Sequence, residues 1–450
     1  MSRPRAVLVS VQLPGVDDAE HASSLDELGR LARTLGLEVA FRLTQKRDRI
    51  DPGAVLGAGK LRELARLTGG DGEVPSGASP TQKKQVYVPT LEREEEAPAP
   101  PDLEALPPEE RATVVLVDHD LGPSQARNLE KAAGVEVMDR TSVILGIFHR
   151  HARSREAKIE VEIARLKYLS PRLREVGGGG DRQRGGVGGR GAGESSLELD
   201  RRKIRDRIAE LARELDTVRK VSATQRSRRQ EQRKVALVGY TNAGKSSTMR
   251  ALTGKEVYVA DALFATLGTT VRVLPGVTPR VLVSDTVGFI KKLPHDLVAS
   301  FRATLDEAAS AELLLHVVDA SDSAFRSHME VTNGLLDELG VAVPRRLLLN
   351  KVDRLSTGTK ALRQEEFPDA LQLSAHDGED MRQLAAHIAD FFDCGLEELV
   401  LLVPWSQQGR LPRIHEHCRV LDQGSEATGT RLRVRAPPEV ADSLRDLALR

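Results

Sequence analysis

Residues 235–246 read Val-Ala-Leu-Val-Gly-Tyr-Thr-Asn-Ala-Gly-Lys-Ser, and this stretch decides the fold. The apolar run 235–238 is typical of a buried parallel strand, and a helix is predicted from Lys245 to Leu252. Between them lies Gly-x-x-x-x-Gly-Lys-Ser, the pattern of a phosphate-binding loop in its required strand–loop–helix setting. Gly239 and Gly244 allow the backbone amides to turn inward around phosphates. The stretch therefore predicts a nucleoside triphosphate site.

Three further motifs follow this loop in order, and they specify the base. Asp285-Thr286-Val287-Gly288 ends one apolar run, Asn350-Lys351-Val352-Asp353 ends another, and Ser374-Ala375 follows a third. The Asp353 carboxylate is predicted to accept hydrogen bonds from the ring N–H and the amine of guanine, a donor pair that adenine lacks on that edge. The Ala375 amide is predicted to contact the guanine oxygen. The ordered set predicts a GTPase.

Each motif supplies residues with a predicted role at the nucleotide. Lys245 is expected to reach the β- and γ-phosphates, and the hydroxyl of Ser246 and the carboxylate of Asp285 to hold Mg²⁺. The amide of Gly288 is expected to contact the γ-phosphate, so that its loop senses the nucleotide state. The other predicted nucleotide contacts are Gly239, Tyr240, Thr241, Asn242, Ala243, Gly244, Ser247, Thr286, Val287, Asn350, Lys351, Val352, Asp353, Ser374, Ala375 and His376.

Two positions in these motifs bear on catalysis. Phe289 stands where Ras-type GTPases carry the glutamine that orients the attacking water, and an apolar side chain cannot do this. Intrinsic hydrolysis is therefore expected to be slow and to need outside help. Asn242 is a candidate ligand for a potassium ion acting in place of an arginine finger; the alternative is that it only shapes the loop.

Composition favours a soluble protein with about three domains in 450 residues. Two cysteines, Cys394 and Cys418, exclude a disulfide framework and suit a reducing cytosol. No apolar run is long enough to span a membrane, and the N-terminus does not resemble a signal peptide. These features together predict a cytoplasmic protein. No heptad run predicts a coiled-coil dimer, and a monomer is expected.

The zero net charge conceals a segregation of charge. Residues 201–234 carry 13 Lys and Arg against 5 Asp and Glu, and residues 150–190 carry 11 against 5. These basic segments flank residues 177–193, which contain 10 glycines and three arginines. Ile159, Ile163, Leu166 and Leu169 have helical spacing before this stretch, and Ile204, Ile208, Leu211 and Leu215 after it. We predict a basic two-helix arm with a flexible tip that faces a polyanion; a plain linker is the alternative.

The predicted class is α/β: a P-loop GTPase domain, a mostly parallel sheet with helices on both faces, over residues 234–396. A small α/β domain (1–148) and the arm (149–233) precede it, and a small α/β domain (397–450) follows. In the first domain we predict strands at 6–11, 37–42, 113–117 and 135–138, a helix opened by a capping box at Ser24 and Glu27, and another after Pro123. In the last domain we predict strands at 399–403 and 430–434 and a helix from Pro438. Residues 69–110 are predicted to be a disordered insertion.

With these pieces in order the chain resembles the HflX family of translational GTPases over nearly its whole length. The resemblance rests on VALVGYTNAGKS at 235–246, LFATL at 263–267, DTVGFI at 285–290, LPH at 293–295 and FRATL at 301–305. Outside this domain it rests on LTQKRDR at 43–49, GAGK at 57–60, DHDLGPSQARNLE at 118–130, DRTSVILGIF at 139–148 and GRGAGESSLELDRRKIRDRI at 189–208. The chain departs from the family pattern at Gly146, Ala192, Ser195, Ser196, Ser247 and Gly268.

The resemblance implies a GTPase that binds the large ribosomal subunit and ribosomal RNA, and that splits, recycles or rescues ribosomes under stress. It also implies that Thr266 holds Mg²⁺ in switch I, with Thr269 and Thr270 as substitutes. Two other interpretations remain open. One is an RNA-binding and remodelling protein that uses ATP or GTP on a different RNA, and the other is a nucleotide-dependent scaffold.

Overall fold

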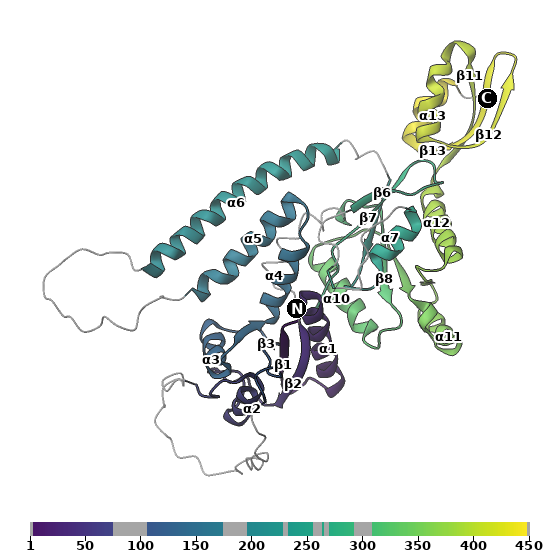
Figure 1. Cartoon of the computed structure of the whole chain (residues 1–450). Coiled ribbons are helices and arrows are strands. Elements are labelled where there is room, and N and C mark those ends of the chain that lie inside the picture. Colours follow the sequence, from purple (N-terminus) through teal and green to yellow (C-terminus); the bar gives the residue numbers. More distant parts are fainter. Residues whose placement is uncertain are drawn as a thin grey trace, which may run out of the picture. The chain divides into compact units, whose positions relative to one another are not determined.

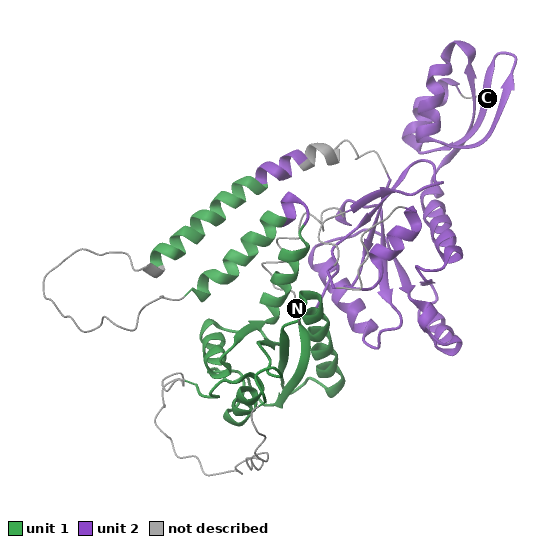
Figure 2. Ribbon diagram, in the orientation of Figure 1, with its two compact units in different colours: residues 1–152, 158–215 green, residues 153–157, 216–450 purple. Residues whose placement is uncertain are grey.

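The computed structural model describes residues 3–74, 106–173, 196–227, 233–254, 263–264, 270–291 and 308–447. The chain divides into two compact units, one of residues 1–152 and 158–215, the other of residues 153–157 and 216–450 (Figure 2). In the described part, no helix is both long and apolar enough to cross a membrane.

The first unit opens with a four-stranded parallel sheet in the order β2-β1-β3-β4. Its strands are β1 (Arg5–Gln12), β2 (Glu38–Lys46), β3 (Val114–Val117) and β4 (Glu136–Asp139). Helices α2 (Ala58–Thr68) and α3 (Pro123–Ala133) cover the face that carries Val7 and Val9. Helices α1 (Asp18–Leu35) and α4 (Arg140–His151) pack together on the other side of the sheet (Figure 1). This is the predicted small α/β domain.

Two of the expectations for this domain need correction. Ser24 does not open a helix, because α1 begins earlier, with Asp17 as the N-cap accepting from the Glu20 amide at 2.6 Å. The Ser24 hydroxyl lies inside the helix and donates to Asp118 at 2.6 Å. The predicted disordered insertion at 69–110 is also too long at both ends. Gly69 caps α2 in the left-handed conformation (φ 93°), the Gly72 amide donates to the Ala132 carbonyl at 2.9 Å, and the Glu110 amide donates to the Pro107 carbonyl at 2.9 Å. Residues 75–105 lie outside the described part.

Two helices follow the sheet of the first unit. Helix α5 runs from Arg155 to Leu169, and α6 from Ser196 to Ser227. At 32 residues, α6 is roughly 48 Å long. Of its predicted apolar positions, Leu211 and Leu215 are buried while Ile204 and Ile208 are half-buried. The predicted tip, 177–193, lies outside the described residues.

The second unit is built on a six-stranded sheet in the order β10-β9-β8-β5-β7-β6, in which only β6 is antiparallel. The strands are β5 (Arg233–Val238), β6 (Thr270–Val273), β7 (Val281–Asp285), β8 (Leu313–Asp319), β9 (Arg345–Asn350) and β10 (Leu371–Gln372). Helices α7 (Lys245–Thr253) and α12 (Gly378–Asp393) cover one face. On the other face, Phe325 of α10 (Phe325–Glu338) packs with Val318 and Leu349. Helix α11 (Thr357–Glu366) lies between β9 and β10 in sequence. This mostly parallel sheet with helices on both faces agrees with the predicted class.

The C-terminal part of this unit is a three-stranded antiparallel sheet in the order β11-β13-β12. Its strands are β11 (Glu397–Pro404), β12 (Arg419–Glu426) and β13 (Gly429–Ala436), and α13 (Leu411–His417) and α14 (Pro438–Leu444) complete its core. The predicted strands 399–403 and 430–434 and the helix from Pro438 are therefore present. The domain boundaries given above stay a prediction.

Candidate nucleotide-binding site

The phosphate-binding loop connects β5 to α7 at the carboxyl end of the parallel sheet. Both of its glycines are required by their surroundings. A Cβ on Gly239 (φ 147°) would lie 2.1 Å from the Val317 carbonyl oxygen, and one on Gly244 (φ 99°) would lie 2.1 Å from the Asn350 side-chain nitrogen. Asn242 adopts the left-handed conformation (φ 61°), which asparagine tolerates better than most residues. Close packing against β8 and β9 thus shapes the loop.

Lys245 lies at the start of α7 with its amine directed into the loop. Its Nζ donates to the carbonyl oxygens of Gly239 at 3.0 Å and Tyr240 at 2.8 Å. Burial lowers the pKa of Lys245 to about 8, although the nearby Asp285 carboxylate opposes this change. Because an ammonium has three donors, one remains for a phosphate oxygen. The loop therefore holds a lysine preorganised for an anion.

Ser246 and Asp285 meet where Mg²⁺ is predicted. The Ser246 hydroxyl donates to Asp285 Oδ2 at 2.5 Å, and Asp285 is fully buried at the end of β7. A hydroxyl and a carboxylate are oxygen donors of the kind that Mg²⁺ takes together with waters and substrate phosphates. Among the described residues, no three His, Cys, Asp or Glu side chains gather into a metal site. The donor set therefore fits a magnesium ion shared with a nucleotide, and not an all-protein cage.

Two other observations concern this end of the sheet. The Thr241 hydroxyl oxygen is buried and has no hydrogen-bond partner within the described residues. Buried polar atoms rarely stay unsatisfied, so an oxygen-rich ligand at this loop would complete the site. For switch I, Thr266 and Thr269 lie outside the described residues, whereas Thr270 begins β6 and is the register partner of Asp285.

The loop after β7 lies directly against the phosphate-binding loop. A Cβ on Gly288 would lie 2.8 Å from Thr241 Cα and 2.9 Å from Lys245 Nζ, so only glycine fits. The Phe289 side chain is buried, with an exposed fraction of 4%. Its backbone amide donates to the Gly239 carbonyl at 3.1 Å, and its carbonyl accepts from the Thr241 amide at 2.7 Å. The burial of Phe289 is in keeping with the prediction that this side chain cannot orient a water.

The predicted base-reading residues are joined to the phosphate-binding loop by hydrogen bonds. The Asn350 side chain donates to the Ala243 carbonyl at 2.8 Å and accepts from the Ala375 amide at 3.2 Å. Lys351 (φ 61°) donates to the Asn242 carbonyl and to Asp319, each at 2.7 Å. These hydrogen bonds therefore join the motif at 350–353 to the phosphate-binding loop, although the two are more than 100 residues apart in the sequence.

Asp353 is exposed and keeps its charge. It accepts a hydrogen bond from the Ser374 hydroxyl at 2.7 Å, which lowers the pKa of its carboxyl. The Ser374 oxygen also accepts from the His376 amide at 3.3 Å. The ionised carboxylate is thus oriented and able to accept the donor pair of a guanine. Of the other predicted contacts, Val352, Thr286 and Val287 are buried, and Ser247 is half-buried on α7.

The sequence reasoning missed three polar residues near the site. His316 of β8 is buried, and burial, aided by the charges of Arg345 and Lys245, lowers its pKa to about 4. A histidine inside the apolar run 313–318 is visible in the sequence and could have indicated a buried polar side chain in this strand. His328 of α10 stacks on Tyr240, and Asp319 pairs with Lys351. No sequence signal connects these last two residues to the loop, because only the sheet topology brings them there.

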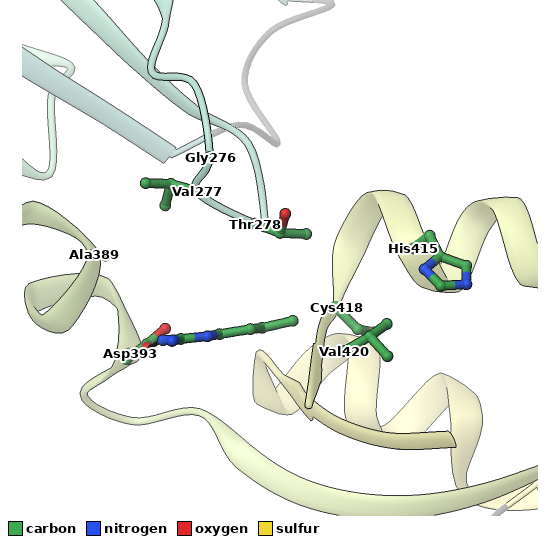
Figure 3. A pocket seen from close by; sticks show the side chains of 9 residues that line it. Gly276, Val277, Thr278, Ala389, Asp393, His415, Cys418 and Val420 are labelled. Carbon is green, nitrogen blue, oxygen red and sulfur yellow. Dashed lines mark hydrogen bonds and ion pairs between the residues drawn. The ribbon is translucent and has the colours of Figure 1, made fainter. Parts of the chain in front are cut away.

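A separate cavity of about 290 Å³ lies in the second unit, away from these motifs (Figure 3). Thr278 lies on one side of it and His415 on the other, and Asp393 forms an ion pair with Arg419 at its edge. Burial raises the pKa of the Cys418 thiol to about 11, so this cysteine is not a reactive thiolate. The cavity contains none of the predicted nucleotide contacts.

Comparison with known proteins gives matches along the whole chain. Residues 22–73 and 101–149 match the family model described as GTP-binding GTPase N-terminal, and residues 151–229 match GTP-binding GTPase Middle Region. Residues 234–351 match the model described as 50S ribosome-binding GTPase.

Individual relatives agree with these models. A protein named GTPase HflX from Gluconacetobacter diazotrophicus is 54% identical, and the match covers 99% of this chain and 98% of that one. The GTPase HflX of Escherichia coli is 40% identical over 72% of this chain and 78% of its own. Among solved structures, a GTP-binding protein from Sulfolobus solfataricus in complex with GDP is 20% identical, with a TM-score of 0.43 over 86% of this chain and 99% of that one. The family assignment rests on the sequence relatives.

Proposed function

Since this chain belongs to the HflX family of GTPases and hydrolyses GTP, we propose that it binds the large ribosomal subunit and splits, recycles or rescues ribosomes under stress. The observation that carries this proposal is the match of residues 234–351 to the 50S ribosome-binding GTPase model. That segment holds Lys245, Asp285 and Asn350, so the nucleotide site and the ribosome-binding family description coincide. Loss of the γ-phosphate would change the affinity for the subunit, as in other nucleotide switches.

In this proposal the motifs divide the work at the nucleotide. Lys245 directs its remaining donor to a phosphate oxygen, and Ser246 and Asp285 hold Mg²⁺, which neutralises phosphate charge when bound. Gly288 presents its amide to the γ-phosphate. Asp353, with its oriented carboxylate, selects guanine. The contacts from Asn350 and Lys351 to the phosphate-binding loop support this division, because they hold base-reading and phosphate-reading groups in one frame.

Catalysis would then depend on help from outside the chain. Phe289 is buried and cannot orient a water, so we propose that the ribosomal subunit supplies or positions the missing group. A potassium ion at Asn242 is part of the same proposal. Its support is the position of Asn242 in the loop, where its carbonyl is held by Lys351 at 2.7 Å.

The basic arm is proposed to contact ribosomal RNA. Its support is the charge surplus of residues 150–190 and 201–234, together with the exposed arginines of α6 such as Arg201 and Arg205. Phosphate contacts by such side chains release counterions and give strong, salt-dependent binding. We propose a cytoplasmic monomer that carries out this binding.

The deciding experiment is steady-state GTP hydrolysis by the purified full chain with and without large ribosomal subunits. We expect strong stimulation by large subunits and little by small subunits, which serve as the control for non-specific RNA. The same assay in potassium and in sodium buffer tests the ion at Asn242, and equal rates in the two buffers would exclude it.

Tight GTP binding without stimulation by large subunits would contradict the ribosomal proposal. The RNA-remodelling function on a different RNA would then be favoured by the basic arm. A light-scattering measurement of 70S ribosomes with the protein and GTP tests the splitting step by itself. Unchanged scattering, together with stimulated hydrolysis, would leave ribosome binding in place and exclude splitting.

A further inference from the structure

Tyr240 belongs to the phosphate-binding loop, and its side chain contacts two other segments of the second unit. The side chain is buried, at 4% exposed. Its ring stacks on the His328 imidazole of α10, with 3.9 Å between centroids and 12° between planes. Its hydroxyl oxygen accepts a hydrogen bond from the backbone amide of Lys291 at 2.7 Å. One side chain therefore joins α10 to the loop that follows β7.

That loop, residues 286–291, carries Gly288, and Tyr240 and its neighbours hold it at two points. The first point is the pair of backbone hydrogen bonds that Phe289 makes with Gly239 and Thr241, on either side of Tyr240. The second is the Tyr240 hydroxyl at Lys291. Gly288 precedes both points and lies within contact of Thr241 and Lys245. The backbone of Gly288 therefore lies close to the Lys245 amine.

We propose that Tyr240 is a positioning residue for the recognition of the γ-phosphate. Its hydroxyl fixes residues 286–291 so that the Gly288 amide meets the third phosphate, and its stack on His328 fixes the ring. This inference rests on the proposed γ-phosphate contact of Gly288 and not on ribosome binding, so the two can fail separately.

A specific consequence follows for the two nucleotides. GDP has no γ-phosphate and does not need the loop in position, whereas GTP does. Without the Tyr240 hydroxyl, GTP itself has to order residues 286–291 when it binds. This ordering makes the binding free energy of GTP less favourable. A typical net hydrogen bond corresponds to roughly a five-fold change in affinity. The weakening should therefore appear with GTP and not with GDP.

The test is the Tyr240→Phe variant of the full chain, titrated in the absence of ribosomes with GDP and with a non-hydrolysable GTP analogue. We expect the analogue to bind roughly five-fold more weakly while GDP affinity stays within about two-fold of the parent protein. An equal weakening for both nucleotides would show that Tyr240 only supports the phosphate-binding loop. Unchanged affinities, or tighter binding of the analogue, would also overturn the proposal.

Two sets of variants serve as controls. Tyr168→Phe removes the hydroxyl of a different, half-buried tyrosine, which donates to Asp139 at 2.6 Å in the first unit, and should leave both affinities unchanged. His328→Leu removes the stack and should reproduce the GTP-specific weakening, whereas His328→Phe keeps an aromatic ring and should restore affinity. If leucine and phenylalanine behave alike, the ring stack has no part in positioning. Thermal unfolding of each variant, compared with the parent protein, shows whether the variant is folded. If a His328 variant does not fold, the Tyr240→Phe titrations alone decide the proposal.

Discussion

At the scale of single residues, Lys245 combines burial with the charge that phosphates require. Two backbone carbonyls stabilise its ammonium, but removal from water favours the neutral amine and lowers its pKa to about 8. A bound nucleotide adds negative charge beside the amine and must raise this pKa again. Nucleotide binding and proton binding at Lys245 are therefore linked.

The linkage gives a prediction for pH. Below pH 8 the free protein already carries the proton, so affinity for GDP should be nearly constant. Above pH 8 the amine is neutral in the free protein and must take up a proton on binding, so affinity should fall by up to about tenfold per pH unit. Titration calorimetry at pH 7 and pH 9, in two buffers with different enthalpies of ionisation, measures the proton directly. Proton release, or no exchange at pH 9, would contradict the assignment.

At the scale of elements, a buried ion-pair network in the first unit joins α1 and α4 to the end of β3. Arg140, the first residue of α4, is 1% exposed and donates to Asp118 after β3 at 2.7 Å and to Glu27 of α1. Asp118 and Glu27 are buried as well. Buried charges are tolerated when paired, and removing one partner leaves an uncompensated charge. The Arg140 guanidinium group therefore links α4 to α1 and to the residue that follows β3.

Replacing Arg140 by Met should destabilise this unit by about 3–5 kcal/mol, because two carboxylates then lose their cationic partner inside the protein. Hydrogen exchange of the β1 and β3 amides in increasing denaturant measures the free energy of unfolding of this unit. The matched control is Arg42→Met, which breaks an exposed pair with Asp26 (side chains 46% and 58% exposed) and should cost at most about 1 kcal/mol. Similar destabilisation by both variants would contradict the network's importance.

Secondary structure was predictable where local pattern and tertiary packing agree. The apolar runs at 235–238, 281–284 and 347–349 all became strands of the parallel sheet. The Ser24 capping box failed because Asp17 offers an earlier cap, and because the Ser24 hydroxyl finds a partner on Asp118, which is distant in sequence. Local rules cannot weigh a partner supplied by another element.

At the scale of the whole molecule, the charge of the chain is divided between regions. The basic segment 150–190 lies in the first unit except for residues 153–157, whereas the segment 201–234 is divided, with 201–215 in the first unit and 216–234 in the second. The nucleotide motifs, from Gly239 to Ala375, all lie in the second unit. The basic arm and the predicted nucleotide contacts are nevertheless separate stretches of the chain, so we expect a polyanionic partner to contact the arm while the nucleotide binds elsewhere.

This division predicts how binding to the large subunit depends on salt. The triple variant Arg201→Ala, Arg202→Ala and Arg205→Ala removes exposed cations from α6 and should weaken binding. The slope of log affinity against log salt should also become shallower by roughly 0.7–0.9 for each RNA phosphate that the variant no longer neutralises. Arg382→Ala on α12, whose side chain is 77% exposed, is the control and should leave the slope unchanged. An unchanged slope in the triple variant would show that these arginines do not face phosphate.

The sequence alone determined the class of fold and the kind of ligand, because the backbone geometry of a phosphate-binding loop requires its glycines and lysine at fixed spacing. Only the tertiary structure decided how the motifs are joined: Asn350 to Ala243, Lys351 to Asn242, and Tyr240 to both Lys291 and His328. These contacts depend on the order of the strands in the sheet. There β5 lies between β7 and β8, an order that differs from their order in the sequence. Long-range hydrogen bonds and stacking leave no periodic trace in a sequence, because their partners are set by packing and not by local conformation.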